Sequence, residues 1–341
     1  MVYKLLLISM PYIFSLLTLL GLSFGGLYSY SGVFIIFFVH PSLDFFLHQY
    51  ITINDQLTDS QSSKMLNYSI YLFPLFEFVF LIVVGHYAFY AKTFYEFIGL
   101  TLSAGMITGG FGITMAHEFI HRNHKWERGL GVFLLSLVNY THFRIEHVYG
   151  HHKYVSTPKD PASAPLNMNL YYFILRSIGG GFISAIKLEN KRLKKKSKLE
   201  KIFNNRIIGY LLIMILFTVT VYLLGGIKLI LFWFGQSLMA ICLLEIINYI
   251  EHYGLRRKKT DSNRYEKVRP KHSWDSRHFF TNATLINLGK HSHHHSDAAT
   301  PYYKLKNQEV ASVLPMGYSL AIVLALFPPL WKKIINPLVS N

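Results

Sequence analysis

The stretch Glu146–Ala164, "EHVYGHHKYVSTPKDPASA", places three histidines within six residues and follows them with a run of turn-forming residues. His147 and His151 are four residues apart, so a helix would present both imidazoles on one face, with His152 about 100° further around. Such a group forms either a polar helix end or part of a metal site. The residues "TPKDPASA" are typical of a turn, and we expect them to lead the chain away from the histidines.

The composition around this stretch is that of an integral membrane protein. Of the 341 residues, 51% are apolar and 15% are charged, whereas soluble globular proteins carry about 25% charged residues. Apolar runs near the roughly 20 residues needed to cross a bilayer occur at six places. They are residues 4–22, 24–40, 68–90, 96–116, 207–224 and 227–249. The predicted fold class is therefore all-α, a six-span transmembrane helical bundle with a helical cap that holds the histidines.

Glycines separate the runs of the first and last pairs, so each pair is predicted to form a helical hairpin. An even number of spans places both termini on one side of the membrane. Residues 187–206 and 256–277 hold nine Lys or Arg each, and such loops favour the cytoplasmic side. We therefore expect one membrane domain, residues 1–341, in a bacterial-type inner membrane. Its termini and its cap, residues 117–206 and 250–341, would face the cytoplasm.

The formal net charge of +16 raises the possibility of nucleic-acid binding. The basic residues flank apolar runs, however, which favours the orientation signal and leads us to expect no nucleic-acid partner. The same loops suit membrane lipid headgroups or an acidic protein partner. Cys242 is the only cysteine and lies in an apolar run, so these residues hold no internal disulfide or thiolate-bound iron–sulfur cluster. Electrons for a redox reaction would come from a separate protein.

Histidines recur in four groups beside the predicted cytoplasmic face. The first is "HEFIH", with His117 and His121 four residues apart, and the second is the opening stretch. The third is His252 in "NYIEHYGLR", and the fourth is "HSHHH", residues 291–295. The other histidines lack such spacing and are assigned no role; they are His40, His48, His86, His124, His142, His272 and His278.

Several kinds of metal protein fit parts of this pattern. The motif HExxH is typical of zinc metalloproteases, in which two histidines bind zinc and Glu118 would be the base. A zinc protease needs three protein ligands and an open position, whereas this chain offers at least eight suitably spaced imidazoles, enough for two metal ions. A metal transporter would instead carry its ligands within the spans. Imidazole binds iron, zinc, copper and nickel, so the spacing alone leaves the metal open.

Carboxylates accompany the histidines. Glu118, Glu146 and Glu251 each adjoin one of these histidines in sequence. A carboxylate that accepts an imidazole N–H fixes the tautomer and strengthens the ligand, although a solvated loop charge is the alternative for Glu146. Glu245 and Asn248 lie late in an apolar run, where ionisable groups are costly and usually functional. These five residues are candidates for the surroundings of a metal site.

The order HxxxH, HxxxHH and HxxHH resembles the membrane fatty-acid desaturase and hydroxylase superfamily. The fuller strings "HEFIHR", "EHVYGHHKYVSTPKDPASA", "NYIEHYGLRR" and "LGKHSHHH" resemble the membrane-bound alkane monooxygenase family, which includes the xylene monooxygenase hydroxylase component. The resemblance covers residues 100–305. "NYIEHYG" separates this family from desaturases, and a fatty acyl or lipid desaturase or hydroxylase is the alternative.

The resemblance implies a non-haem centre of two histidine-ligated iron ions, with O₂ as co-substrate. One oxygen atom would enter the terminal C–H bond of an alkane or alkyl chain that arrives from the bilayer. A separate rubredoxin and its NADH-dependent reductase would supply electrons. We expect the first four spans to form the apolar slot, with residues 26–38 shaping its depth. Carried over by position, the implied iron ligands are His117, His121, His147, His151, His152, His252, His291, His294 and His295.

The fourth histidine group departs from the pattern of the family. Where the family usually reads "LQRHSDHH", this chain has Gly289, Lys290 and His293. The double arginine that often follows is replaced by "ATPYYKL". These differences leave all nine implied ligands in place and bear on redox tuning and on the choice of substrate.

Overall fold

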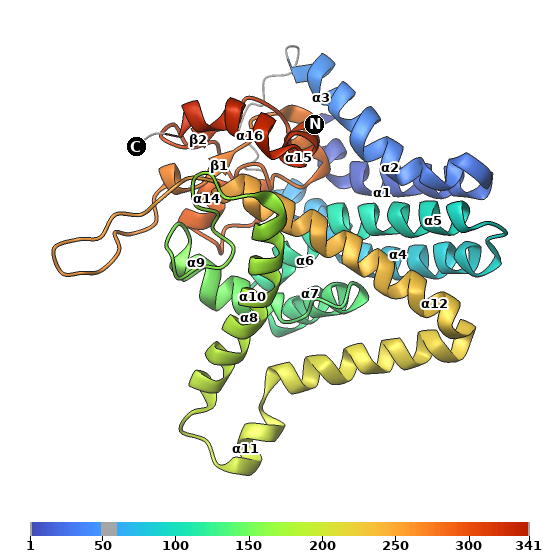
Figure 1. Cartoon of the computed structure of the whole chain (residues 1–341), viewed down its shortest axis with the longest axis horizontal. Helices are drawn as coiled ribbons and strands as arrows, with labels where there is room; N and C mark the ends of the chain where they lie inside the picture. The colour runs from blue at the N-terminus through green and yellow to red at the C-terminus, as the bar shows by residue number, and fades with distance from the viewer. Residues whose placement is uncertain (1, 49–59, 340–341) are drawn as a thin grey trace.

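The structure, a computed structural model, describes residues 2–48 and 60–339, which are mostly helical (Figure 1). Four of the described helical segments are long and apolar enough to cross a membrane. They are Gly26–Phe46, Lys64–Tyr90, Phe94–Ile120 and Arg206–His252. Helices occupy all six predicted apolar runs, while the number of spans stays a prediction because only these four of the described segments have the length and apolarity of a span.

The N-terminal half supplies most of the membrane helices. Its elements in order are α1 (Val2–Ser23), η1 (Gly26–Tyr30), α2 (Ser31–Phe34), η2 (Ile35–Val39), α3 (His40–His48), α4 (Ser60–Tyr90), α5 (Phe94–Ile107), η3 (Thr108–Gly112), α6 (Ile113–Ile120) and α7 (Lys125–Leu137). The predicted joint after α1 is a turn in which Gly25 and Gly26 have φ of 67° and 57°, a conformation that glycine adopts without steric cost. Glu96 stabilises this turn by accepting a hydrogen bond of 2.8 Å from the Gly26 N–H.

The long helix α12 provides the other predicted hairpin. The elements that follow α7 along the chain, up to this helix, are α8 (Phe143–Glu146), η4 (His147–His151), α9 (His152–Tyr154), α10 (Leu170–Leu193), α11 (Lys198–Phe203) and α12 (Arg206–His252). Gly225 and Gly226 interrupt α12 with non-helical backbone angles, Gly226 at φ 59°. The two arms of α12 therefore fold back on one another, as Figure 1 shows in yellow and amber. The glycine joint that the sequence predicts is confirmed.

Small residues allow the second arm of α12 to approach α5 and η3 closely. A Cβ atom on Gly109 would lie 2.8 Å from the Cα of Ala240, and one on Gly105 would lie 2.7 Å from the carbonyl oxygen of Gln236. Close backbone approach of this kind is the usual way for membrane helices to pack. This contact places the end of α6, which carries His117, beside the end of α12, which carries His252.

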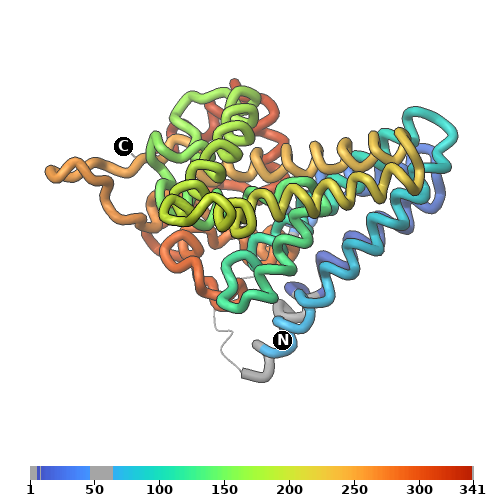
Figure 2. The backbone as a smooth tube through the Cα atoms, turned by 90° about the horizontal axis from the view of Figure 1, so that it is seen from below, coloured from blue at the N-terminus to red at the C-terminus, as the bar shows by residue number. Residues whose placement is uncertain are grey.

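The C-terminal segment covers the histidine-bearing helix ends. It contains η5 (Pro270–His272), β1 (Trp274–Asp275), α13 (Phe279–Thr284), α14 (His291–Ser296), η6 (Tyr302–Lys304), β2 (Ser312–Val313), α15 (Tyr318–Ala325), α16 (Pro328–Ile335) and η7 (Asn336–Leu338). Strands β1 and β2 form a short parallel pair. Figure 2 shows the N-terminal helices and both arms of α12 running toward one end, with the green, orange and red segments gathered at the other.

Two buried polar residues of α3 tie it to the C-terminal segment. Asp44 accepts hydrogen bonds from the backbone N–H groups of Phe280 and Thr281 at 2.9 and 3.2 Å. The ring nitrogens of His40 contact the hydroxyls of Thr284 and Ser319 at 2.6 and 2.9 Å. His40 is thus a hydrogen-bonded core residue, and it does not belong to the histidine groups at the cap.

Glu189 joins α10 to the start of α12. Its buried carboxylate lies 2.7 Å from the Arg192 guanidinium and 2.6 Å from that of Arg206. Burial alone would raise the pKa of Glu189, but hydrogen bonds from Arg192 and Arg206 outweigh it and lower the pKa to about 2. The stabilisation is therefore complete above the unfolded-state pKa of about 4.3 and is lost as the pH falls toward 2.

We expect Glu189→Gln to lower the melting temperature of the protein at pH 7, because the exposed Arg192 and the partly buried Arg206 lose charge-assisted hydrogen bonds to a shared buried carboxylate. The difference from the unchanged protein should shrink as the pH is lowered to 3. Thermal unfolding in detergent measures both effects. Glu200→Gln is the control, since its pair with Lys196 is exposed and contributes little. Equal melting temperatures at pH 7 would contradict the expectation.

Candidate metal centre

Four segments from distant parts of the sequence bring nine histidines together. His117 lies in α6 and His121 directly after it, η4 and α9 carry the opening stretch, α12 ends at His252, and α14 carries the last group. The ligand atoms form two groups, in each of which all lie within 4.8 Å of one another. The first holds His117, His121, His147, His152 and His294, and the second holds His151, His252, His291 and His295. These are the same nine residues that the family resemblance implies.

The nitrogens within each group converge at the separations of metal ligands. In the first group, the Nε2 atom of His152 lies 3.1 Å from those of His147 and His294. In the second, the Nε2 atom of His291 lies 3.1 Å from that of His252 and 2.9 Å from that of His295. Four nitrogens bound at about 2.0–2.1 Å around one ion would lie roughly 3.3 Å apart. Both groups therefore fit a cation held among imidazole nitrogens.

The segment His147–His151 is π-helical, not α-helical. Its i→i+5 hydrogen bonding brings His147 and His152 to the same metal group, and His151 joins the other one. The rings of His147 and His151 lie side by side, with centroids 5.1 Å apart, as a shared face predicts, but their nitrogens belong to different groups. π-helical turns occur frequently at functional sites, and the turn here divides one run of three histidines between two groups.

Burial favours the neutral form of most of these imidazoles. For six of the histidines outside the candidate spans, burial lowers the pKa well below its usual range, and the neighbouring imidazoles lower it further. They are His121, His147, His152, His291, His294 and His295. A metal binds the neutral imidazole, so protons compete weakly with a metal at these nitrogens.

His151 is supported by an acid that the sequence does not reveal. The Nδ1 atom of His151 lies 2.9 Å from the Oδ2 atom of Asp160. Burial opposes charge on both groups, but their mutual attraction and hydrogen bond raise the pKa of His151 and lower the pKa of Asp160. The expectation that "TPKDPASA" leads the chain away from the histidines is therefore wrong, because Asp160 in this turn reaches back to one of them.

A second unpredicted acid holds α14 in place. Asp275, in β1, accepts hydrogen bonds of 2.7 Å from both the backbone N–H and the hydroxyl of Ser292. Burial raises the pKa of Asp275 to about 6. His293, the departure from the family pattern, accepts a hydrogen bond of 2.8 Å from the Lys306 N–H through Nδ1. It thus faces the C-terminal segment and belongs to neither metal group.

Of the acids proposed from the sequence, Glu251 lies nearest to the ligand nitrogens. Its Oε2 atom is 3.2 Å from the Nε2 atom of His291, and Oε1 accepts a hydrogen bond of 2.8 Å from the Tyr318 hydroxyl. Glu118 has different partners, since its Oε1 atom lies 2.6 Å from the Arg122 guanidinium and accepts from the backbone N–H of Tyr302. Adjacency in sequence to a histidine therefore has a different consequence for each acid.

Glu245, Asn248 and Glu146 lie on another side of the histidines. Glu245 accepts hydrogen bonds from the Tyr140 hydroxyl at 2.8 Å and from the Asn248 amide at 3.2 Å. Glu146 borders a small polar cavity together with His147 and His151. Burial and then the negative charge of Asp160 raise the pKa of Glu146 to about 8, so this side chain is a neutral hydrogen-bonding acid near pH 7.

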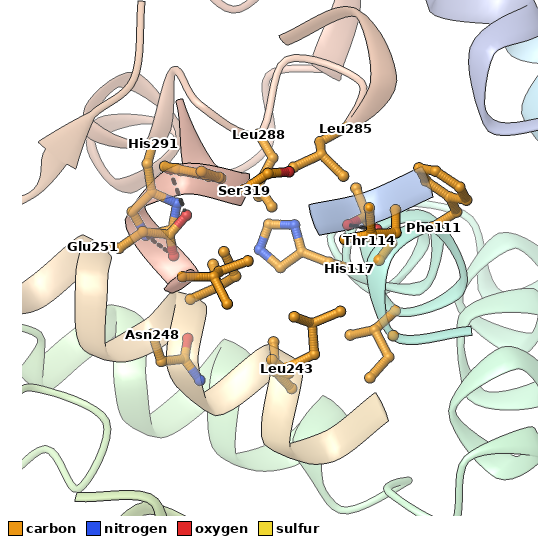
Figure 3. Close-up of a pocket in the computed structure, with 18 of the residues that line it drawn as sticks. Phe111, Thr114, His117, Leu243, Asn248, Glu251, Leu285, Leu288, His291 and Ser319 are labelled. Atoms are coloured by element: carbon orange, nitrogen blue, oxygen red, sulfur yellow. Dashed lines mark hydrogen bonds and ion pairs between the residues drawn. The ribbon is translucent and has the colours of Figure 1, made fainter. Parts of the chain in front are cut away.

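An apolar cavity of about 60 Å³ ends at both histidine groups. Figure 3 shows His117 at its centre, with Glu251 and His291 in close contact at one end. Phe111, Leu243 and Leu288 are among the apolar side chains around it. The cavity thus places apolar walls beside imidazoles of both groups.

Residues 26–38 contribute less to this cavity than the sequence suggests. Ile36 lines it, but Phe34 is 57% exposed and Phe38 is 62% exposed. These rings face outward from the helix bundle, as expected for contact with lipid. The walls come mainly from 109–117, α12 and the C-terminal segment.

Comparison with known proteins agrees with this site. The fatty acid desaturase family model matches residues 93–322. Alkane 1-monooxygenase 2 of Alcanivorax borkumensis is 45% identical over 243 residues, 71% of this chain and 64% of the relative. Alkane 1-monooxygenase 2 of Pseudomonas aeruginosa is 43% identical over 71% of this chain and 64% of that relative. Alkane 1-monooxygenase 1 of the same organism is 36% identical over 92% of this chain and 83% of its own length.

The matched region therefore spans just under two thirds of the first two relatives and most of the third. Four apolar helices of spanning length and these relatives identify an integral membrane protein, and the histidine groups provide a non-haem metal site. The chain belongs to the alkane monooxygenase family, within the proteins that share the fatty acid desaturase domain.

Proposed function

We propose that this protein hydroxylates the terminal methyl group of an alkane or alkyl chain with O₂. The overall reaction converts RH, O₂, two electrons and two protons to ROH and H₂O. The observation that carries the proposal is the apolar cavity that ends at His117, His147 and His291, members of both histidine groups. The relatives named alkane 1-monooxygenase support the same reaction.

The five-histidine and four-histidine groups would each hold one iron ion. Imidazole donors without thiolate suit iron among the transition metals, and the convergent nitrogens fit such ions. When bound, the ions supply the activation of O₂ that an unactivated C–H bond requires. Asp160 orients His151, and Asp275 positions α14 through Ser292, so that the imidazole nitrogens are held before a metal arrives.

The apolar walls of the cavity bind and orient the substrate. Burial of alkyl carbons contributes about 0.8 kcal/mol per CH₂ group, and the substrate is already dissolved in the bilayer. Leu243, Leu288 and Ile322 exclude water from the space beside the ligands, which protects a reactive centre from side reactions. A saturated chain without polar groups fits these walls best.

The proposal extends to location and partners. One membrane domain, residues 1–341, would lie in a bacterial-type inner membrane with the metal centre on the cytoplasmic side. A separate rubredoxin and its NADH-dependent reductase would deliver electrons there. The basic segments 187–206 and 256–277 support this orientation and offer positive charge to an acidic donor.

A zinc protease is the less favoured reading of "HEFIH". Its base would be Glu118, whose carboxylate is engaged by Arg122 at 2.6 Å. Its zinc would need three protein ligands, whereas nine imidazoles form two groups. A desaturase acting on an acyl chain would use a similar cavity, and its product distinguishes it.

Purified protein with iron, rubredoxin, reductase and NADH tests the proposal. Mass spectrometry of products from alkanes of several chain lengths is expected to find 1-alkanols, and metal analysis about two irons per chain. Alkenes or internal alcohols would identify the desaturase or acyl hydroxylase alternative. Failure to oxidise any alkane, fatty acyl or alkyl-aromatic substrate would overturn the proposed function, and one zinc with proteolysis would replace it.

Gly110 is expected to set how long a chain the cavity accepts. It lines the cavity, and the heavy atom nearest to an added Cβ is the Cδ2 atom of Leu243 at 4.0 Å. Gly110 precedes His117 by seven residues, about 10 Å along a helix. We expect Gly110→Leu to lower the yield from longer alkanes at least about tenfold relative to shorter ones, because the added side chain blocks the tail and one lost methylene-sized space costs 1–3 kcal/mol.

Product yields from a mixture of chain lengths measure this preference. Gly209→Leu is the matched control, because a Cβ there meets nothing within 4 Å and Gly209 lies outside the cavity. An unchanged chain-length profile in Gly110→Leu would contradict the assignment of this part of the cavity to the substrate.

A further inference from the structure

A second, polar cavity adjoins the metal centre. His147 and His151 line it, and Phe143, His147 and Asn248 border both this cavity and the apolar one. Its volume is about 10 Å³, while a water molecule needs roughly 10–15 Å³ on the same measure. The cavity is therefore the size of a single water molecule.

Two residues that line this cavity carry unsatisfied polar atoms. The Nε2 atom of His142 and the Oε1 atom of Glu146 are buried and have no hydrogen-bond partner among the described residues. Leaving a buried polar group unpaired costs about 1–3 kcal/mol. Buried water usually makes two to four hydrogen bonds to such groups, and Glu245 and Asn248 offer further polar atoms in the same walls.

His142 connects this cavity to the outside of the protein. It also lines a groove of about 380 Å³ between α10 and α12, where Tyr210 forms part of the wall. Tyr210 in turn borders a neighbouring groove that contains the charged residues Lys125, Arg128 and Arg144. Tyr210 lines both grooves, so the charged groove adjoins the mostly apolar one on which His142 lies.

The reaction requires such a connection. Hydroxylation consumes two protons and releases one water molecule for each alcohol, and the cavity proposed for the substrate is walled mainly by apolar side chains. We propose that the polar cavity binds one water molecule, and that His142 and this water are the route by which protons reach the metal centre. The role in proton delivery rests on the proposed function, whereas the water site does not.

The state of His142 suits this route. Burial lowers the pKa of His142 to about 4, so its ring is neutral near pH 7. A neutral imidazole has one N–H and one lone pair, and it passes a proton by accepting on one nitrogen and releasing from the other. A water molecule in the polar cavity would lie next to the metal centre, because His147 and His151 line this cavity.

A cryo-electron microscopy map of the iron-loaded protein, at a resolution that shows water, tests the binding site. We expect one density within about 2.7–3.2 Å of both His142 Nε2 and Glu146 Oε1. The density should be lost in His142→Phe. A map that resolves other buried waters but has no density here would overturn the proposal.

Rates of alkanol formation in H₂O and D₂O test the route. His142→Phe is expected to slow the reaction at least about tenfold, within the range for a lost proton-transfer group, and to raise the solvent isotope effect. Iron content and the substrate concentration for half-maximal rate should stay unchanged. His86→Phe, an exposed histidine on α4, should change none of these. If His142→Phe does not fold, His142→Gln should keep the water density and still raise the isotope effect.

The outcomes separate the two proposals. An unchanged rate and isotope effect in the folded His142 variants would overturn the route. Failure of the unchanged protein to oxidise any alkyl substrate would overturn the proposed function, and the density between His142 and Glu146 would still decide the water site.

Discussion

Replacing His291 by alanine is expected to reduce the iron content from about two ions to about one and to abolish alkane hydroxylation. The Nε2 atom of His291 lies within 3.1 Å of that of His252 and 2.9 Å of that of His295, so its loss removes a central donor of the four-histidine group. Loss of residues that only support a ligand typically costs 10–100-fold in affinity or activity. Loss of the ligand itself should exceed about 100-fold.

Metal analysis of the purified variant and its rate of alkanol formation measure this effect. His124→Ala is the matched control, because His124 is exposed and its side chain makes no capping hydrogen bond to α7. The control should keep about two irons and full activity. A His291→Ala protein with unchanged iron content and rate would contradict the assignment of the four-histidine group as a metal site.

Asp160→Asn is expected to weaken the same site while preserving the fold. Asparagine keeps the size of the side chain but loses the negative charge that faces the Nδ1 atom of His151 at 2.9 Å. The imidazole then becomes a weaker donor with a less defined tautomer, and we expect iron affinity at the four-histidine group to fall about 10–100-fold.

Titration with a chelator measures how tightly the protein retains iron. Thermal unfolding of the metal-free protein measures its stability separately. One iron should leave at lower chelator concentration and the other should be unaffected. Asp261→Asn applies the same chemical change to an exposed loop residue and should alter neither curve. Identical curves for Asp160→Asn and the unchanged protein would show that Asp160 does not support the metal.

The helical architecture could be predicted because its signals are local. Long apolar runs indicate membrane helices, and the glycines at 25–26 and 225–226 mark the turns that the structure contains. The same argument overestimated the role of residues 26–38, since apolarity does not distinguish a ring that faces lipid, such as Phe38, from one that lines a cavity.

The surroundings of the histidines were harder to predict. Adjacency in sequence to a histidine suggested that Glu118 supports a metal ligand, but its carboxylate pairs with Arg122. Adjacency missed Asp160, which lies nine residues after His151 in the same stretch, and Asp275, which contacts Ser292 from another segment. An acid in a turn rich in proline and serine has no pattern that separates it from a solvated loop charge, so only the path of the folded chain identifies it.

The sequence by itself determined the helical membrane class of the protein and the four histidine groups, because helix-forming runs, ligand types and their spacing are properties of short segments. The family resemblance of these segments implied the nine ligands. The tertiary structure decided how these imidazoles divide into groups of five and four, which acids face them, and where the apolar and polar cavities lie. The physical reason is that these features depend on contacts between α6, η4, α12 and α14, whose separation in sequence says nothing of their distance in space.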